Sequence, residues 1–323
     1  MLPTMVPCNS VSLLFFVTLT FAASISNATK TDITMTTHNL HGFSKSSKYL
    51  KDCIKTHGGI WFIQEHWLSE NQLHKFQQVD AQFVARSGME DAVSSGIYRG
   101  RPFGGVSICW SPDLSHAITP VTNYKHKRVV AVELRTADNN FLLISIYMPF
   151  YNSSRREQCM AETIDAISMI ELLIDDHPQH KVVIGGDLNT ELKGNSPFDA
   201  LWKDHMTKNR STYCDQYVSS PNYTYRHDSL NQTKFNDHFI VSQDILDRGV
   251  THNHIILDEG ENTSDHLPLL MKMSLQLNKA NFATPQASGP KIVNWKKMSE
   301  EDKTKYSSLL EQLRKLKFFY LLN

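Results

Sequence analysis

The strongest constraint on the fold of this chain is the alternation, from Lys30 onward, of short β-rich runs with segments of helical period. Apolar and β-branched runs between turn residues predict strands. They lie at Asp32–Thr37, Ile60–Gln64, Gly104–Trp110, Arg128–Arg135, Phe141–Tyr147, Lys181–Ile184, Phe239–Ser242 and Leu267–Gln276. Helical spacing predicts helices at Ser44–His57, Arg155–Asp176 and Pro197–His205. This mixture favours an α/β protein in which helices cover the sheets.

The best-defined helix is Arg155–Asp176. A helix with one apolar stripe packs that stripe against a sheet or another helix, so we expect one buried face here. The stripe is expected to combine Met160, Ile164, Ile167, Ile170 and Leu173.

Composition divides the chain into four segments. Residues 1–30 form a hydrophobic N-terminal segment, and residues 31–277 form the domain of alternating strands and helices. Residues 278–297 have the small residues and prolines of a linker, without an apolar period. Residues 298–323 are expected to form a C-terminal helix capped by Ser299. Its apolar stripe would be Leu309, Leu310, Leu313 and Leu316.

The N-terminal segment has two interpretations. The apolar run Val11–Ile25 is followed by small residues and resembles the central region of a signal peptide, although no Lys or Arg precedes it. The alternative is a stray extension upstream of the domain. N-glycosylation triplets are compatible with secretion but also arise by chance. Six of them begin at Asn27, Asn152, Asn209, Asn222, Asn231 and Asn262.

The overall charge gives no pull towards nucleic acid, because 33 Lys and Arg balance 33 Asp and Glu. Binding to DNA or RNA must therefore come from local basic patches, each of which is by default a solvated loop. These patches are Lys125–Arg128, Arg99 with Arg101, and Arg155–Arg156. The cysteines lack paired spacing and are interpreted as reduced thiols, not as a zinc site. They are Cys8, Cys53, Cys109, Cys159 and Cys214.

Polar residues that can do chemistry stand where the predicted strands end or begin. Strand ends in a layered α/β protein meet at one edge, so we expect these side chains to line one cleft. They are Asn39, Glu65, Tyr147, Asp187 with Asn189, and Asp265 with His266.

This set suits cleavage of a phosphodiester, which needs a cation on the phosphate, a positioned water and stabilisation of the leaving oxygen. Glu65, helped by Asn39, is enough for Mg²⁺, which keeps most of its waters. Asp187 can deprotonate the attacking water. Asn189, expected on the same side of an extended segment, can donate to the phosphate.

A protonated His266 would contact a non-bridging phosphate oxygen, and a carboxylate such as Asp237 would raise its pKa and orient its ring. Tyr147 could donate its hydroxyl to the phosphate or the leaving group. Each residue also has a structural explanation. An Asp-x-Asn sequence closes turns or caps helices, a Glu at a strand end is usually solvated, and an Asp-His pair can lie on the surface.

The order of these residues resembles the successive motifs of the endonuclease/exonuclease/phosphatase superfamily. The motifs are NLHG from Asn39, QEHWL from Gln64, YMP from Tyr147, GGDLN from Gly185, DHFIVS from Asp237 and SDHLP from Ser264. Together they span about Asp32–Leu275. Within the superfamily, THNLHGF, QEHWL, GRPFGGVSICW and SDHLPL are similar to non-LTR retrotransposon endonuclease domains, as is the tail with Trp295 and Tyr306–Leu316.

The resemblance implies a four-layered α/β sandwich with a Mg²⁺ site, for which Mn²⁺ is an alternative ion. It assigns metal binding to Glu65, with Asn39 nearby and Asp265 beside the metal. The catalytic set it implies is Asn39, Glu65, Tyr147, Asp187, Asn189, Asp237, Asp265 and His266, with Thr224 contacting the phosphate. One departure is Asn236, which stands where the family pattern has an apolar residue before the Asp.

The leading interpretation is a Mg²⁺-dependent phosphodiester hydrolase, namely a DNA endonuclease derived from a non-LTR retrotransposon that leaves a 3′-hydroxyl. A phosphatase or a secreted deoxyribonuclease-like enzyme of the same fold, or a non-catalytic remnant, are the alternatives. The DNA backbone is the expected partner, and no obligate protein partner is evident. Membrane association is expected only if the N-terminal segment is retained. Retrotransposon origin would favour the nucleus, and a true signal peptide would favour secretion.

Overall fold

A computed structural model of the chain describes residues 30–88, 103–215, 218, 221–277, 299 and 304. The chain separates into two compact units, residues 1–279 and 280–323. All the elements below belong to the first unit. Residues 1–29 of the expected N-terminal segment, the linker and all but Ser299 and Thr304 of the expected C-terminal helix lie outside the described residues. In the part of the chain that is described, no helix has the length and apolar character needed to cross a membrane.

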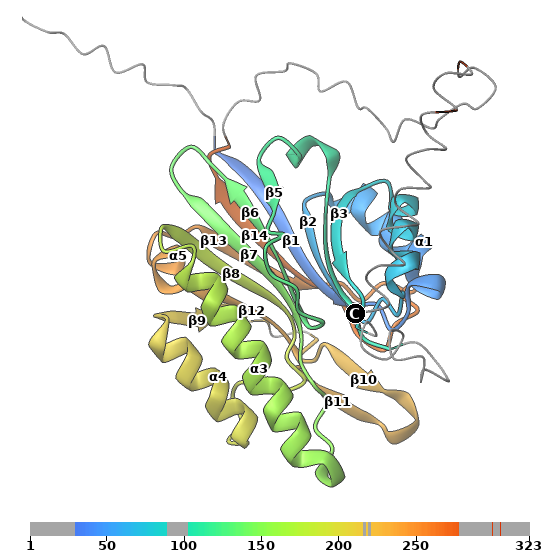
Figure 1. The fold of residues 1–323 in the computed structure, drawn as a ribbon. Helices are drawn as coiled ribbons and strands as arrows, with labels where there is room; N and C mark the ends of the chain where they lie inside the picture. Colours follow the sequence, from blue (N-terminus) through green and yellow to red (C-terminus); the bar gives the residue numbers. More distant parts are fainter. Residues whose placement is uncertain are drawn as a thin grey trace, which may run out of the picture. The chain divides into compact units, whose positions relative to one another are not determined.

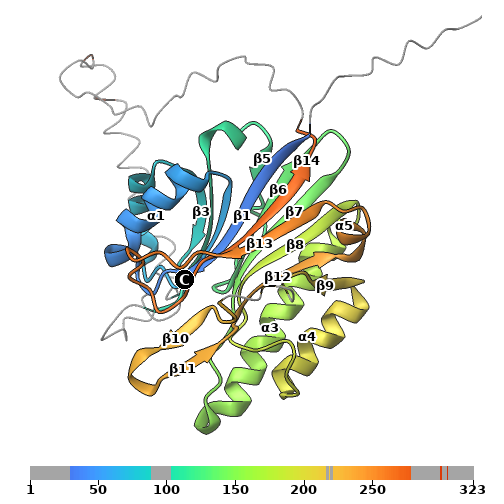
Figure 2. The same ribbon diagram turned by 180° about the vertical axis from the view of Figure 1, so that it is seen from behind.

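Two six-stranded sheets form the centre of the first unit (Figures 1 and 2). The first has the order β13 (Thr251–Ile256), β14 (Leu269–Leu275), β1 (Thr31–Asn39), β2 (Ile60–Gln64), β4 (Val106–Trp110) and β3 (Gln82–Arg86). The second has the order β5 (Ile118–Pro120), β6 (Val129–Arg135), β7 (Asn140–Tyr147), β8 (His180–Asp187), β12 (Asp237–Ser242) and β9 (Ser211–Tyr213). Both sheets are mixed, because β1 pairs with β2 and β7 pairs with β8 in parallel whereas their other neighbours are antiparallel.

Helices cover the outer faces of both sheets (Figure 1). Helix α1 (Phe43–His57) and the 3-10 helix η1 (Glu70–Val79) cover the first sheet. Helices α3 (Arg156–Asp175) and α4 (Pro197–Lys208) cover the second. The order helix, sheet, sheet, helix confirms the expected four-layered α/β sandwich. The remaining elements are α5 (Gln243–Asp247), the short 3-10 helices η2 (Pro112–Leu114), η3 (Ser153–Arg155) and η4 (Asp228–Leu230), and the hairpin of β10 (Tyr225–His227) and β11 (Gln232–Lys234).

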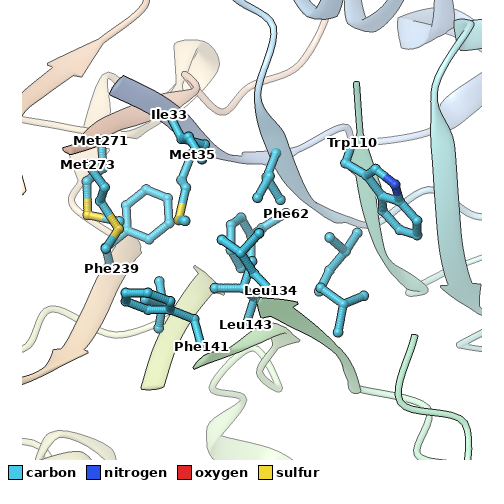
Figure 3. Packing of buried hydrophobic residues seen from close by; sticks show 14 of the residues in the cluster. Ile33, Met35, Phe62, Trp110, Leu134, Phe141, Leu143, Phe239, Met271 and Met273 are labelled. Carbon is cyan, nitrogen blue, oxygen red and sulfur yellow. The ribbon is translucent and has the colours of Figure 1, made fainter. Parts of the chain in front are cut away.

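The core explains why the central strands are apolar on both faces. Phe62 points into the layer between the sheets, whereas its neighbours Trp61 and Ile63 pack under α1 and η1. Successive residues of a strand face opposite sides, so a strand covered on both sides needs a continuous apolar run. The layer between the sheets contains Ile33, Met35, Phe62, Trp110, Leu134, Phe141, Leu143, Phe239, Met271 and Met273 (Figure 3).

The buried stripe of α3 differs from the expected one. Ile167, Ile170 and Leu173 are buried as predicted, but Ile164 is 48% exposed. Cys159, Thr163 and Ala166 are buried in its place. The buried residues still repeat at three- and four-residue spacing, so α3 has one buried face that is rotated from the expected one.

The four cysteines within the described residues, Cys53, Cys109, Cys159 and Cys214, are free and buried. Cys8 lies outside those residues. Helix α4 begins as predicted, with Pro197 in its first turn and a capping box formed by Ser196 and Asp199. Such a cap satisfies backbone donors that a helix start leaves unpaired.

Candidate active site

The register of the strands brings polar side chains to one edge of the sandwich. In the second sheet Tyr147, the last residue of β7, pairs with Asp187, the last residue of β8. Asp187 in turn pairs with Asp237, the first residue of β12. In the first sheet Asn39 ends β1 beside the end of β2, and Glu65 follows directly. The strand ends predicted to meet therefore do meet.

Asn39 connects the two sheets through its side-chain amide. Its Nδ2 donates to Glu65 Oε1 at 3.1 Å and to Asp187 Oδ2 at 2.9 Å. Its Oδ1 accepts a hydrogen bond from the backbone N–H of His41 at 3.0 Å. In this structure Asn39 therefore orients two carboxylates through its amide N–H groups, and its amide oxygen, which has two lone pairs, accepts one hydrogen bond.

His266 lies between two buried carboxylates. Its Nδ1 is 2.7 Å from Asp237 Oδ2, and its Nε2 is 3.9 Å from Asp187 Oδ2. Burial alone would lower the pKa of His266, but the charges of Asp237 and Asp187 outweigh it and raise the pKa to about 10. His266 is therefore an imidazolium at neutral pH, held against Asp237 as the sequence predicted.

The surroundings of Asp187 change the pKa of its carboxyl group. Burial raises its pKa to about 7, the charge of His266 opposes that shift, and the charge of Asp237 adds to it. Asp187 Oδ1 also accepts the backbone N–H of Asn189 at 2.8 Å. A carboxyl group with a pKa near neutrality is matched to proton transfer at physiological pH.

Tyr147 keeps its hydroxyl proton at the same edge. Burial, together with the negative charges of Glu65 and Asp187, raises the pKa of Tyr147 well above its usual value of 10. The guanidinium of Arg128 lies 5.5 Å from the centre of the Tyr147 ring and donates to the Tyr147 carbonyl at 3.2 Å. Tyr147 is consequently a neutral hydrogen-bond donor with a fixed ring.

Asn189 does not continue an extended segment, contrary to the expectation from sequence. Its φ is 51°, in the left-handed region, and its Nδ2 donates to the Met148 carbonyl at 2.9 Å. The left-handed turn places the Asn189 side chain across the end of β7 instead of along β8. The same Nδ2 lies 3.5 Å from Asp187 Oδ2, so Asn189 still belongs to the cluster.

Thr224 lies below the site surface. Its side chain is fully buried, and its Oγ1 accepts the backbone N–H groups of Asn236 and Asp237, each at 3.0 Å. Thr224 therefore holds the start of β12, in place of the phosphate contact expected from the sequence. Asn236, the departure from the family pattern, is also buried, and the Thr224 bond to its N–H keeps the strand in place.

Asp265 is paired with a residue that sequence reasoning missed. Its Oδ1 lies 2.5 Å from Nδ1 of His41, in the turn after β1. Burial alone would raise the pKa of Asp265, but the hydrogen bond from His41 and the charge of His266 hold it below its ordinary value. Trp67, also unassigned from sequence, donates its Nε1–H to Glu65 Oε2 at 2.9 Å and contacts the His41 ring edge-on. His41 lies in the NLHG motif and Trp67 lies in the QEHWL motif. Membership of these motifs was the only sequence feature that could have identified the two residues.

Backbone strain is concentrated around these groups. Among non-glycine residues with positive φ are His41 at 47°, Glu65 at 49°, Trp67 at 55° and Asn189 at 51°. Left-handed backbone is uncommon for such residues and gathers at functional sites. Here it turns side chains from the strand ends towards one another.

The donor set fits a hard divalent cation. Glu65 and Asp265 are half-buried carboxylates, and neither forms an ion pair with a Lys or Arg among the described residues. Carboxylate oxygens are the protein ligands that Mg²⁺ prefers. Asp187, Asp237 and His266 also lie close enough together to hold an ion. The bond between Asp237 and His266, however, already neutralises part of the negative charge of these residues.

The basic patches expected from sequence have different environments. Arg128 forms an ion pair with Glu162 at 2.5 Å, whereas Arg155 and Arg156 are exposed. Arg99 and Arg101 lie outside the described residues.

Comparisons with known proteins agree on the fold. No protein-family model and no curated protein matches the sequence. Among solved structures, the endonuclease domain of TRAS1, a telomere-specific non-LTR retrotransposon, is similar with a TM-score of 0.57 and 14% identity, over 76% of this chain and 100% of that one.

Two structures of NExo from Neisseria are similar as well. A variant form, described as a 3′ phosphatase bound to a product DNA hairpin, has a TM-score of 0.53 and 14% identity, over 75% of this chain and 99% of that one. The Neisseria meningitidis protein, described as a 3′–5′ exonuclease, has a TM-score of 0.53 and 15% identity over the same shares. This chain therefore has the endonuclease/exonuclease/phosphatase fold, as its motifs predicted. Fold alone does not determine the reaction.

Proposed function

We propose that the protein is a Mg²⁺-dependent phosphodiester hydrolase, and specifically a DNA endonuclease of non-LTR retrotransposon origin. The observation that supports this most is the meeting of Asp187, Asp237 and His266 at one edge of the sandwich, where Asn39 donates both to Asp187 and to Glu65. The TRAS1 endonuclease domain shares the fold, which supports the finer assignment. A retrotransposon endonuclease would act on DNA in the nucleus.

In this proposal Asp187 is the general base. Its carboxylate accepts a proton from the water that attacks phosphorus, and the N–H groups of Asn39 and Asn189 keep it oriented. The raised pKa of Asp187, about 7, makes it a stronger base than an ordinary carboxylate while leaving a large ionised fraction at neutral pH.

His266 would stabilise the negative charge that grows on the phosphate. Its imidazolium uses Nδ1 to donate to Asp237 and leaves Nε2 directed towards the side of Asp187, where a non-bridging oxygen can accept a hydrogen bond. Asp237 is a positioning residue that keeps His266 charged. Tyr147, which retains its proton, donates to the phosphate or the leaving oxygen, and Asn189 adds a further contact.

Glu65 and Asp265 would hold the Mg²⁺ ion, with Mn²⁺ as an alternative, and Asn39 orients Glu65. When bound, the ion supplies positive charge to the phosphate and to the leaving oxygen. The His41 bond to Asp265 and the Trp67 bond to Glu65 fix the two carboxylates before any ion arrives.

Nicking of supercoiled plasmid by the full-length protein tests this proposal. We expect open-circular product with Mg²⁺ or Mn²⁺ and none with EDTA. His266→Ala and Asp187→Asn should each slow nicking by about 10²- to 10⁴-fold, the usual contribution of one acid or base group. Ile164→Ala, an exposed position on α3, is the matched control and should nick at the wild-type rate.

A folded protein that nicks no DNA would contradict the endonuclease assignment. The NExo likeness then makes DNA with a 3′-phosphate the next substrate, with release of inorganic phosphate as the readout. Phosphate release that His266→Ala abolishes would identify a phosphatase. Inactivity on both substrates would identify a non-catalytic remnant.

A further inference from the structure

The loop between β13 and β14 carries two residues of the candidate active site. It spans residues 257–268, contains Asp265 and His266, and is here called the β13–β14 loop. The loop passes beside helix α1, which lies on the outer face of the first sheet (Figures 1 and 2). A side chain that does chemistry needs supporting backbone that is held in place, so the contacts of this loop bear on the reaction.

One side of α1 faces this loop. Ser46, Cys53 and His57 are separated by seven and four residues, a spacing that places them on the same side of a helix. The Ser46 Oγ lies 2.9 Å from Thr263 Oγ1. The Cys53 thiol donates to Glu259 Oε2 at 3.5 Å, and His57 Nε2 lies 3.3 Å from Glu259 Oε1. The loop is therefore attached to α1 at two places, Thr263 and Glu259.

Each carboxylate oxygen of Glu259 accepts a hydrogen bond from a different residue of α1. Burial raises the pKa of the Cys53 thiol to about 12, and the charge of Glu259 adds to this shift, so the thiol keeps the proton that it donates. His57 Nε2 must likewise carry a hydrogen, because a carboxylate can only accept. Hydrogen bonds to a charged acceptor are stronger than those between neutral groups, so Glu259 is the stronger of the two attachments.

A short chain of hydrogen bonds joins Glu259 to the candidate active site. The Asn262 backbone N–H donates to the Glu259 carbonyl at 3.1 Å. The Asn262 side chain donates through Nδ2 to the His266 carbonyl at 2.6 Å and accepts the Ser264 N–H through Oδ1 at 3.0 Å. The Ser264 hydroxyl donates to the Asn39 carbonyl at 2.6 Å and accepts the His266 N–H at 3.1 Å. A displacement of Glu259 therefore reaches the backbone of His266 through Asn262.

We propose that Glu259 is a positioning residue for phosphodiester hydrolysis. Helix α1 holds its carboxylate through two donors, and the β13–β14 loop in turn places Asp265 and His266. The inference rests on the proposed function and adds to the reaction a residue that lies outside all six sequence motifs. Catalytic groups lose much of their effect when they move by about 1 Å, so release of the loop from α1 should slow the reaction although every reacting group is still present.

Plasmid nicking by the full-length protein tests the role of the carboxylate. Glu259→Ala removes both acceptors and should lower the maximal nicking rate by about tenfold, the magnitude that loss of a hydrogen bond to a charged group produces. The plasmid concentration at half-maximal rate should stay the same. Glu259→Gln keeps an acceptor oxygen on a side chain of the same size and should restore most of the rate. Glu261→Ala, at an exposed glutamate of the same loop, is the matched control and should nick at the wild-type rate.

Variants on α1 test the same contact from the other side. His57→Leu removes the donor and should slow nicking, whereas His57→Gln keeps an N–H donor and should not. Two changes that act through one contact are not additive, so the Glu259→Ala, His57→Leu double variant should nick no more slowly than Glu259→Ala alone. A double variant slowed by the product of the two single effects would overturn the proposed link between α1 and Glu259.

The position of His266 can be followed without any reaction, by NMR of the histidine ring signals in metal-free protein, with His266→Ala identifying the signal. Glu259→Ala should shift this signal, and Glu261→Ala should not. An unshifted signal, or nicking by Glu259→Ala at the wild-type rate, would overturn the inference and leave the endonuclease proposal intact. A shift that depends on Glu259 in a protein that cleaves no DNA would support the placement of His266 by Glu259 and refute the proposed reaction.

Discussion

At the scale of single residues, adjacent side chains at the start of β12 have separate partners. Asp237 pairs with His266, whereas His238 Nδ1 lies 2.9 Å from Asp215 Oδ2, and both members of this second pair are buried. His238 Nε2 lies 3.0 Å from the Phe235 carbonyl oxygen. Both ring nitrogens of His238 therefore face acceptors, an arrangement that requires the protonated form. The pair of His238 and Asp215 therefore holds the backbone next to Asp237 in place.

The charge on His238 makes stability depend on pH. Burial alone would lower the pKa of His238, but the Asp215 carboxylate outweighs it and holds the pKa above the ordinary 6.5. The pair's stabilisation is then complete below about pH 6.5 and is lost as pH rises through the folded-state pKa. We expect His238→Gln to lower the free energy of unfolding by about 3 kcal/mol at pH 6, as loss of one partner of a buried pair does, and by less at pH 9.

Urea denaturation of wild-type and variant protein between pH 5.5 and 9 measures this difference. Lys208→Gln is a suitable control, because its ion pair with Glu171 is on the surface and should contribute little at any pH. A constant difference between wild type and His238→Gln across the range would show that folding does not raise the pKa of His238.

At the scale of elements, strand β8 ends at a residue of the candidate active site, Asp187, and contains two glycines. A Cβ atom at Gly186 would meet the carbonyl oxygen of Ile146 in the neighbouring β7. A Cβ atom at Gly185 would approach the rings of Phe239 and Phe62 in the layer between the sheets. The glycines therefore allow β8 to lie close to its neighbours and to bring Asp187 to its position.

We expect Gly186→Ala to lower the free energy of unfolding by about 3 kcal/mol, because the clash is with backbone that cannot move without disturbing the β7–β8 register. Gly260→Ala is the matched control, since nothing lies within 4 Å of a Cβ atom there, and its effect should stay within about 0.5 kcal/mol. Thermal denaturation followed by circular dichroism compares the two. A Gly186→Ala protein as stable as the control would mean that β7 and β8 are farther apart than described.

At the scale of the whole molecule, the sandwich contains its own core and its own candidate site. Strands β1 and β14 are paired neighbours, so the two ends of the domain lie together at Thr31 and Leu275. Every residue of the candidate active site lies between these two positions in the sequence. The first compact unit, residues 1–279, contains all of these strands.

We expect a protein shortened to residues 30–277 to unfold cooperatively and to nick plasmid at about the full-length rate. Its melting temperature should lie within about 3 °C of the full-length value, a change equivalent to less than about 1 kcal/mol for a domain of this size. Differential scanning calorimetry makes the comparison. A shortened protein that melts without a cooperative transition would show that the remaining residues are part of the folding unit.

Much of the element pattern was predictable from sequence, because it depends on local periods. The runs at Ile60–Gln64 and Phe141–Tyr147 are strands as expected, since strands buried on both faces must be apolar throughout. The buried face of α3 was predicted less well, because Thr163 and Ala166 pack where Ile164 was expected. Which side of an amphipathic helix meets a sheet depends on side-chain size at the contact as well as on hydrophobicity.

The sequence by itself determined the α/β class, the order of the motifs and the positions of Asp187 and His266 beside strand ends, because these follow from residue type and spacing along the chain. The tertiary structure alone decided that His41 meets Asp265, 224 residues away, and that Thr224 supports β12 from below. It also decided that Phe150 lines one cavity and Tyr151 lines another. Such contacts depend on how the two sheets pack against each other, and no local pattern contains that information.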